Sequence, residues 1–275
     1  MFLDLGERKL DLKQPKIMGV LNMTPDSFSD GGKYSSLDEA FLACLEMVKE
    51  GASIIDIGGE STRPGASEVS SEEQLDRVIP LILKIKQNLD TVISIDSGNA
   101  AVIKEATDNG AEFVNDVYAL TKKDAMTEVS EAHTAVCLMH MKGKPISMQD
   151  QPIYSNILDE IRSFLLDRAS KCIAAGIKRN SIIIDPGFGF GKTVSDNLIL
   201  LKNLHVFSEL KFPICVGLSR KSFIGETTNR AIDQRVPGSL SAALIAIQNG
   251  ANIIRTHDVG PTKDAIEIYN SLSRV

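Results

Sequence analysis

Short, uninterrupted apolar runs recur along the whole chain, and most of them are rich in Val and Ile. They lack the alternation of apolar and polar positions that marks a strand with one face in water. Consecutive apolar positions are typical of strands covered on both faces, as in a parallel sheet. The eight runs lie at residues 17–22, 53–59, 92–96, 113–117, 135–140, 182–187, 213–219 and 252–257.

The segments between these runs carry the spacing of amphipathic helices. Two of the helices are expected to begin with capping boxes, Ser36 with Glu39 and Ser70 with Glu73, and Pro80 is expected to kink the second helix. Eight strands that alternate with helices in 275 residues predict an α/β fold, a (β/α)8 TIM barrel, with residues 1–275 forming a single domain. A doubly wound open sheet is the alternative, but no dinucleotide fingerprint follows the first strand.

Composition narrows the classes of protein that need to be considered. The formal net charge is -6, which argues against non-specific binding to nucleic acid. No apolar run approaches the roughly 18 residues of a membrane span, and the N-terminus lacks the pattern of a secretion signal. The four cysteines lie in apolar segments and form no C-x-x-C pair, so we expect reduced thiols and a cytoplasmic protein. Cys137 and His140 have a C-x-x-H spacing, but two ligands do not make a zinc site.

The stretch DPGFGFGKT (185–193) ends like a nucleotide-binding loop, but its spacing excludes that class. A P-loop places a glycine five residues before the Gly-Lys-[Ser/Thr] glycine, and this chain has Pro186 there. The stretch is therefore interpreted as a loop that follows a buried strand, and Pro186 ends that strand.

Polar residues follow nearly every predicted strand, at the end of a barrel where active sites lie. They are Asn22, Asp56, Glu60, Asp96, Asn115, Asp116, His140, Asp185, Lys221, Arg255 and His257. Asp56 is the one most suited to a structural role. Asp96, Asn115 and Asp185 suit a flat heterocycle that carries amino and ring N–H groups. The predicted anion donors are Arg63, Arg255 and His257, joined by Lys192, Arg220 and Lys221 in loops. Such a site would take a substrate with a heterocyclic head and a phosphate tail.

Five motifs, in order along almost the whole chain, resemble those of the dihydropteroate synthase family of pterin-binding barrels. They are GVLNMTPDSFSDGG, DIGGESTRPGA, DPGFGFGK, VGLSRKSFIG and RTHDV. The resemblance implies the condensation of 4-aminobenzoate with (7,8-dihydropterin-6-yl)methyl diphosphate, which gives 7,8-dihydropteroate and diphosphate. The first two motifs contain long Gly- and Ser-rich loops, which we expect to act as lids.

The resemblance also implies roles for single residues. Asp96, Asn115, Met139, Asp185 and Lys221 are expected to bind the pterin. Asn22, Arg63, Arg255 and His257 are expected to bind diphosphate, with Asn22 as the Mg²⁺ contact. The aminobenzoate site is expected to comprise Phe28, Thr62, Pro64, Phe190 and Ser222, and the catalytic group to comprise Arg63, Lys221, Arg255 and His257.

The expected partners are therefore small-molecule substrates and a second copy of the chain, with no nucleic acid and no membrane. A methyltransferase acting on methyltetrahydrofolate is one alternative, but it would have little use for Arg63, Arg255 and His257. A non-catalytic pterin-binding paralogue is another, and loss of the lid motifs would mark it. After Asp96 the family commonly has a longer polar residue where this chain has Gly98, which is expected to loosen that loop.

Overall fold

The structure is a computed structural model that describes residues 1–23, 36–60, 69–143 and 152–272. Its centre is a parallel sheet with the strand order β8-β7-β6-β5-β4-β3-β10-β9. A parallel bridge between Ile184 and Ile214 joins the two outer strands and closes the sheet into a barrel. The strands are β3 (Lys16–Asn22), β4 (Ile54–Gly58), β5 (Val92–Asp96), β6 (Phe113–Asp116), β7 (Ala135–Met139), β8 (Ile182–Asp185), β9 (Cys215–Gly217) and β10 (Ile253–Thr256). All eight predicted strands are confirmed.

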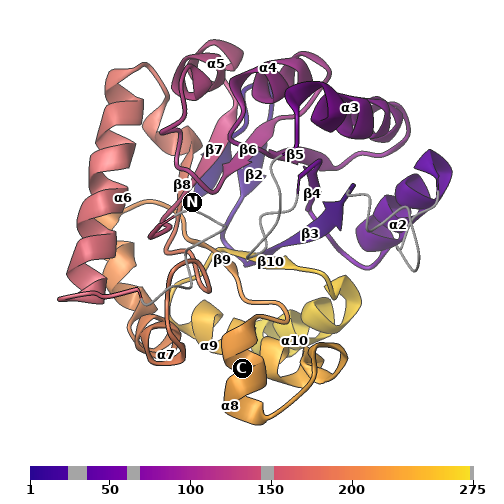
Figure 1. Ribbon diagram of the computed structural model, residues 1–275. Helices are drawn as coiled ribbons and strands as arrows, with labels where there is room; N and C mark the ends of the chain where they lie inside the picture. The colour runs from indigo at the N-terminus through magenta and orange to yellow at the C-terminus, as the bar shows by residue number, and fades with distance from the viewer. Residues whose placement is uncertain (24–35, 61–68, 144–151, 273–275) are drawn as a thin grey trace.

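Helices surround the barrel as a ring (Figure 1). They are α2 (Leu37–Lys49), α3 (Ser71–Asn88), α4 (Ala100–Asp108), α5 (Ala125–Ala132), α6 (Ile157–Ala174), α7 (Val194–Lys202), α8 (Ser222–Thr228), α9 (Val236–Gln248) and α10 (Val259–Leu272). Short 3-10 segments are η1 (Arg179–Ser181), η2 (Leu204–Leu210) and η3 (Ile232–Gln234). The Ser36 and Ser70 hydroxyls cap α2 and α3, each accepting the N–H three residues on at 3.2 Å. Helix α3 continues past Pro80.

Two layers of apolar side chains explain why the strand sequences do not alternate. Ile54 points into the barrel, whereas the next residue, Ile55, packs under the helices, and both are fully buried. Burying an aliphatic side chain of this size contributes roughly 1.5–3 kcal/mol, so both faces of each strand stabilise the fold. The four cysteines are all buried and free, as expected. No described helix is both long and apolar enough to cross a bilayer.

An antiparallel hairpin, which the apolar pattern did not predict, closes the base of the barrel. It consists of β1 (Phe2–Asp4) and β2 (Lys9–Asp11), and each strand has only three residues. Leu3, Leu5 and Leu12 belong to the same buried cluster as Phe113 and Ile253 from inside the barrel. The hairpin therefore seals the end opposite the one where the polar residues gather.

Candidate active site

The parallel register brings residues of four adjacent strands, three of them polar, to one level at the mouth of the barrel. Asn22, Gly58, Asp96 and Asn115 are successive register partners across β3, β4, β5 and β6. A Cβ atom at Gly58 would lie 3.4 Å from the Asn22 Oδ1 atom and 3.6 Å from the Asp96 Cβ atom. Glycine therefore keeps the space between those two side chains open.

Arg255 is the cationic centre of the mouth. Its Nε atom donates to Asp56 and its NH2 group donates to Asp96, both at 2.7 Å. Asp56 is fully buried and also accepts from the Ser94 hydroxyl at 2.5 Å and from the Asn115 amide at 3.0 Å. These partners satisfy Asp56, so it is a structural residue that orients Arg255, as the sequence suggested.

Asp96 keeps one carboxylate oxygen unused. Its Oδ1 atom is buried and has no hydrogen-bond partner among the described residues. Burial raises the pKa of Asp96 to about 7, Arg255 opposes the rise and Asp56 adds to it. A buried acceptor without a donor costs about 1–3 kcal/mol. A ligand that donates an N–H group to this oxygen would recover that cost.

A second carboxylate faces the mouth from β8. Asp185 is 5 % exposed and accepts the Gly187 N–H at 2.7 Å. Burial raises the pKa of Asp185, while the Gly187 N–H and Lys221 counteract it. Burial also disfavours the charged form of Lys221, so it lowers the pKa of this lysine to about 8. The Lys221 Nζ atom lies 4.1 Å from the centre of the Phe190 ring. Asp185 and Lys221 are thus neighbouring opposite charges, the carboxylate buried and the lysine half-buried.

Two residues predicted as anion donors are used inside the protein, so those predictions were wrong. Lys192 is only 3 % exposed, and its ammonium group donates to the carbonyls of Gly187 and Phe190. Arg220 forms an ion pair with Asp258, with the Nε atom 3.0 Å from a carboxylate oxygen. Neither side chain is available to bind a ligand anion in this arrangement.

Three further predicted residues lie at or beside the mouth. His257 is half-buried, and its Nδ1 atom lies 3.2 Å from the Ser219 hydroxyl. Ser222 is exposed at the first position of α8, and Met139 is buried at the end of β7 as the register partner of Asp185. Phe28, Thr62, Arg63, Pro64 and most of both predicted lid loops lie outside the described residues.

His140 is not a mouth ligand but lies behind the site. Its Nδ1 atom is 3.1 Å from the Lys192 Nζ atom, and the Phe164 ring packs edge-on against it at 5.1 Å. Burial, and then the charge of Lys192, lower the pKa of His140 to about 3. A neutral imidazole is therefore built into this region.

A cluster of possible metal ligands lies within the barrel. Cys137, Asp185 and Cys215 place ligand atoms within 4.8 Å of one another, and all three are buried. Contact with the Cys215 thiol and burial raise the pKa of Cys137 well above its usual value. Since a thiolate is the metal-binding form, a protonated Cys137 is suited to packing rather than to coordination.

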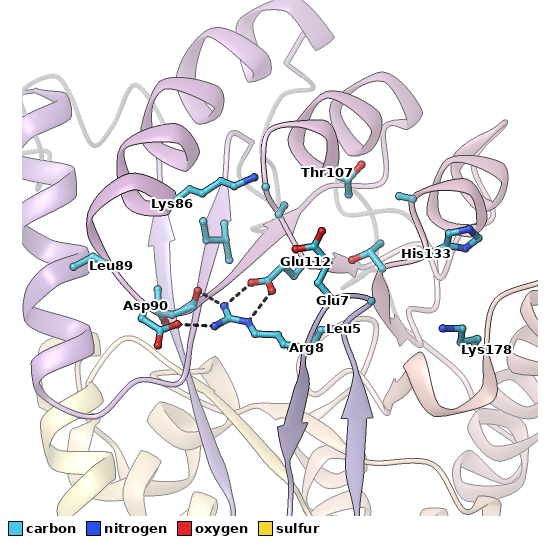
Figure 2. Close-up of a pocket in the computed structure, with 17 residues that line it drawn as sticks. Leu5, Glu7, Arg8, Lys86, Leu89, Asp90, Thr107, Glu112, His133 and Lys178 are labelled. Carbon is cyan, nitrogen blue, oxygen red and sulfur yellow. Dashed lines mark hydrogen bonds and ion pairs between the residues drawn. The ribbon is translucent and has the colours of Figure 1, made fainter.

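A cavity of about 690 Å³ lies at the opposite end, beneath β5, β6 and β7 (Figure 2). Arg8, from the hairpin turn, donates to Glu112 at 2.7 Å and to Asp90 at 2.8 Å. The arginine is thus paired with acidic groups of the cavity wall itself. Active sites of (β/α)8 barrels lie at the other end, so the mouth is the candidate site despite this cavity.

Comparisons with known proteins identify the family. The family model described as "Pterin binding enzyme" matches residues 18–257. The dihydropteroate synthase of Haemophilus influenzae is 46 % identical over 271 residues, which cover 98 % of each chain. The Escherichia coli K12 enzyme is 46 % identical over 262 residues, covering 95 % of this chain and 93 % of that one.

Solved structures agree with both the fold and the family. Yersinia pestis dihydropteroate synthase in complex with a sulfonamide drug superposes with a TM-score of 0.96 at 44 % identity, with full coverage of both chains. The Xanthomonas albilineans enzyme in complex with 7,8-dihydropteroate gives a TM-score of 0.90 at 39 % identity, also with full coverage of both. The chain belongs to the pterin-binding enzyme family and, within it, to the dihydropteroate synthases.

Proposed function

We propose that the mouth residues divide the dihydropteroate synthase reaction among three subsites. The reaction joins 4-aminobenzoate to (7,8-dihydropterin-6-yl)methyl diphosphate and releases diphosphate. The observation that carries this assignment is the free acceptor of Asp96, which lies in the same mouth as the buried carboxylate of Asp185. Two buried carboxylates, one of which has an oxygen without a donor, suit a heterocycle rich in N–H groups.

The pterin subsite would lie deepest. Asp96 and Asp185 would accept ring and amino N–H groups, and Asn115 would add an amide from β6. Asn115 already donates its Nδ2 group to Asp56, which leaves its oxygen to accept from a ligand. Met139 would pack against the flat ring, and Lys221 would donate to a ring acceptor beside Asp185.

The diphosphate subsite would use Asn22, Arg63, Arg255 and His257. Arg255 is preoriented by Asp56, so it loses little freedom when it meets an anion. The Asn22 side-chain oxygen faces the open space above Gly58, and Mg²⁺ prefers such neutral and anionic oxygen ligands. Mg²⁺ held there would neutralise part of the charge on the leaving diphosphate.

The aminobenzoate subsite would comprise Phe28, Thr62, Pro64, Phe190 and Ser222. The Phe190 ring lies 4.1 Å from the Lys221 ammonium group, which supports a position for the aminobenzoate beside the proposed pterin subsite. Ser222 is at the N-terminal end of α8, where backbone N–H groups favour a carboxylate.

No nucleophilic side chain is required for the reaction. The bond between the pterin methylene and the diphosphate oxygen breaks, and the electron pair leaves with diphosphate. The arylamine nitrogen then attacks the methylene carbon and loses a proton. Arg63, Lys221, Arg255 and His257 are the proposed catalytic groups because they balance charge on the departing anion and hold the pterin.

We also propose that the enzyme is a homodimer that works in the cytoplasm. Leu198 and Ile199 on α7 and Ile245 on α9 are exposed apolar residues on two helices in contact, which could form one self-complementary face. The four buried, free cysteines suit a reducing compartment. Analytical ultracentrifugation of wild type and of Ile245→Glu tests the dimer. A mass of one chain for the wild type would exclude it.

The site assignment is tested by diphosphate release, measured with and without 4-aminobenzoate in the presence of Mg²⁺. Wild type should release diphosphate and form dihydropteroate in equal amounts. Asp185→Asn should lose turnover while keeping its circular dichroism spectrum. Turnover like that of wild type in this variant would overturn the pterin assignment. Pterin binding without any release would instead favour a non-catalytic paralogue or a methyltransferase.

A further inference from the structure

We propose that Lys192 is a positioning residue that links the pterin and aminobenzoate subsites through the loop between β8 and α7. The inference rests on the subsites proposed above, but it concerns a side chain that lies behind them. Lys192 is buried, whereas most lysines reach water. Its hydrogen bonds indicate what compensates for removing the ammonium group from water.

The Lys192 ammonium group donates to backbone carbonyls that follow two strands, β7 and β8. Its Nζ atom donates to the Gly187 carbonyl at 2.8 Å and to the Phe190 carbonyl at 3.0 Å. The His140 carbonyl is 3.4 Å away and the His140 Nδ1 atom 3.1 Å. With His140 neutral, this nitrogen accepts when the ring proton is on Nε2. A single side chain therefore fastens the loop to the end of β7.

The loop needs a hydrogen-bond donor because its backbone lies very close to carbonyl groups of the segment after β7. At two positions this leaves no room for a side chain. Gly187 and Gly191 both have positive φ angles, 74° and 62°. A Cβ atom at Gly187 would lie 1.9 Å from the His140 carbonyl oxygen, and one at Gly191 would lie 2.2 Å from that of Lys142. Carbonyl groups forced together in a dry region need a donor, and Lys192 supplies it.

Two further side chains hold the same loop from its other side. The Asn197 Oδ1 atom accepts the Gly189 N–H at 2.7 Å, and the Tyr154 hydroxyl donates to the Gly191 carbonyl at 2.8 Å. The loop is thus fixed by three side chains: Lys192 within it, Asn197 in α7 and Tyr154 from the segment before α6. That degree of restraint is expected for a segment that must present functional groups with little freedom.

Two of the three proposed subsites, those for the pterin and for aminobenzoate, depend on this loop. The Gly187 N–H holds the Asp185 carboxylate, and Lys192 holds the Gly187 carbonyl. Lys192 also holds the Phe190 carbonyl, and the Phe190 ring lies against Lys221. Removing the Lys192 donor should therefore displace both the pterin carboxylate and the aminobenzoate-facing ring.

The donor role can be separated from the role of charge. Burial lowers the pKa of Lys192 to about 7, with Asp185 opposing the change, but the neutral amine still donates. Lys192→Gln keeps a donor group of similar reach without the charge. Lys192→Met keeps similar bulk and removes the donor. Lys202→Met, on the exposed end of α7, is the matched control.

The test is steady-state kinetics with both substrates varied, alongside thermal unfolding. For Lys192→Met we expect kcat/KM for each substrate to fall roughly 100-fold, since displacement of about 1 Å has that effect. Lys192→Gln should recover a large part of the loss, and Lys202→Met should match wild type. A purely structural lysine would lower the Tm and leave kcat/KM per folded molecule unchanged, which would overturn the proposal. Equal losses in the Gln and Met variants would also overturn it.

A milder variant keeps the proposal testable if Lys192→Met does not fold. Tyr154→Phe removes only the hydrogen bond to Gly191, on the Phe190 side of the loop. It should raise KM for 4-aminobenzoate severalfold and leave KM for the pterin diphosphate unchanged. Unchanged KM for both substrates would count against a positioning loop. If Asp185→Asn were also active, the subsites themselves would be wrong, which distinguishes the two failures.

Discussion

Both ends of the barrel hold an arginine beside carboxylates, but the two ends differ in whether the carboxylate oxygens all have donors. At the base, Arg8 is paired with Asp90 and Glu112 at the edge of an open cavity. At the mouth, one arginine bridges two buried carboxylates, and an oxygen of Asp96 still lacks a donor. The cavity of about 690 Å³ therefore lies at the end where the arginine is already paired. Unbalanced buried charge marks the functional end better than the volume of a cavity does.

The largest effect is expected from Arg255→Met, which removes the cation that the two carboxylates share. Breaking a buried ion pair typically costs about 3–5 kcal/mol, because the remaining charge is left without compensation. We expect the urea midpoint to fall accordingly and diphosphate release to be lost. The double variant Arg255→Met, Asp56→Asn should recover stability but not activity. Normal turnover in the single variant would remove Arg255 from the mouth chemistry.

Leu3→Ala tests the hairpin seal at the base. The Leu3 side chain is fully buried among the barrel-interior residues, and Leu→Ala changes at such sites cost about 2–5 kcal/mol. Stability should fall while kcat/KM at 25 °C stays near that of wild type. Phe2→Ala is the control, since Phe2 is largely exposed in the same strand. A large loss of kcat/KM in folded Leu3→Ala would mean that the two ends are coupled.

An acid-induced loss of stability is expected behind the mouth, at His140. The pKa of this imidazole is about 3 in the fold, against about 6.5 in the unfolded chain. The unfolded state therefore binds more protons between these values. The stabilisation is fully present above pH 6.5 and is lost as the pH falls toward 3.

Between pH 6.5 and 5 the resulting loss from His140 should reach about 2 kcal/mol. Urea denaturation of wild type and of His140→Gln at pH 7 and at pH 5 measures it. The variant should lose less stability than wild type over this interval. Equal losses in the two proteins would contradict a buried neutral imidazole.

The smallest effect is expected from Arg8→Met at the base. Arg8 is partly exposed, so water screens its ion pairs, and we expect a cost of about 1 kcal/mol. Its kcat/KM should not change. High salt should narrow the stability difference between the variant and wild type. A loss of activity here would make the base cavity a functional site after all.

The sequence predicted the barrel well because its strands are buried on both faces and leave a simple pattern. It also predicted that Asp96, Asn115 and Asp185 lie at the same end of the barrel, since parallel strands end at one rim. It could not predict what each side chain does there. Lys192 and Arg220 look like free cations in the sequence, but folding brings carbonyl groups and Asp258 to them from other segments.

Two other features were missed for different reasons. The hairpin strands are three residues long, too short to show a period. Gly98 was expected to loosen its loop, but it is buried, and a Cβ atom there would lie 2.6 Å from an Asp116 oxygen. The glycine thus permits close packing. Only the fold shows which neighbour makes a small residue necessary.

The hairpin seal also has a consequence for the order in which the chain assembles during synthesis. Leu3 is made long before Ile253, which belongs to the cluster that buries it. Strand β10 must also enter between β3 and β9, whose facing edges lack a partner until it arrives. A nascent chain therefore cannot close the barrel stepwise from its N-terminus. It exposes two strand edges and an unsealed apolar interior until the last strand has left the ribosome, the interval in which aggregation competes with folding.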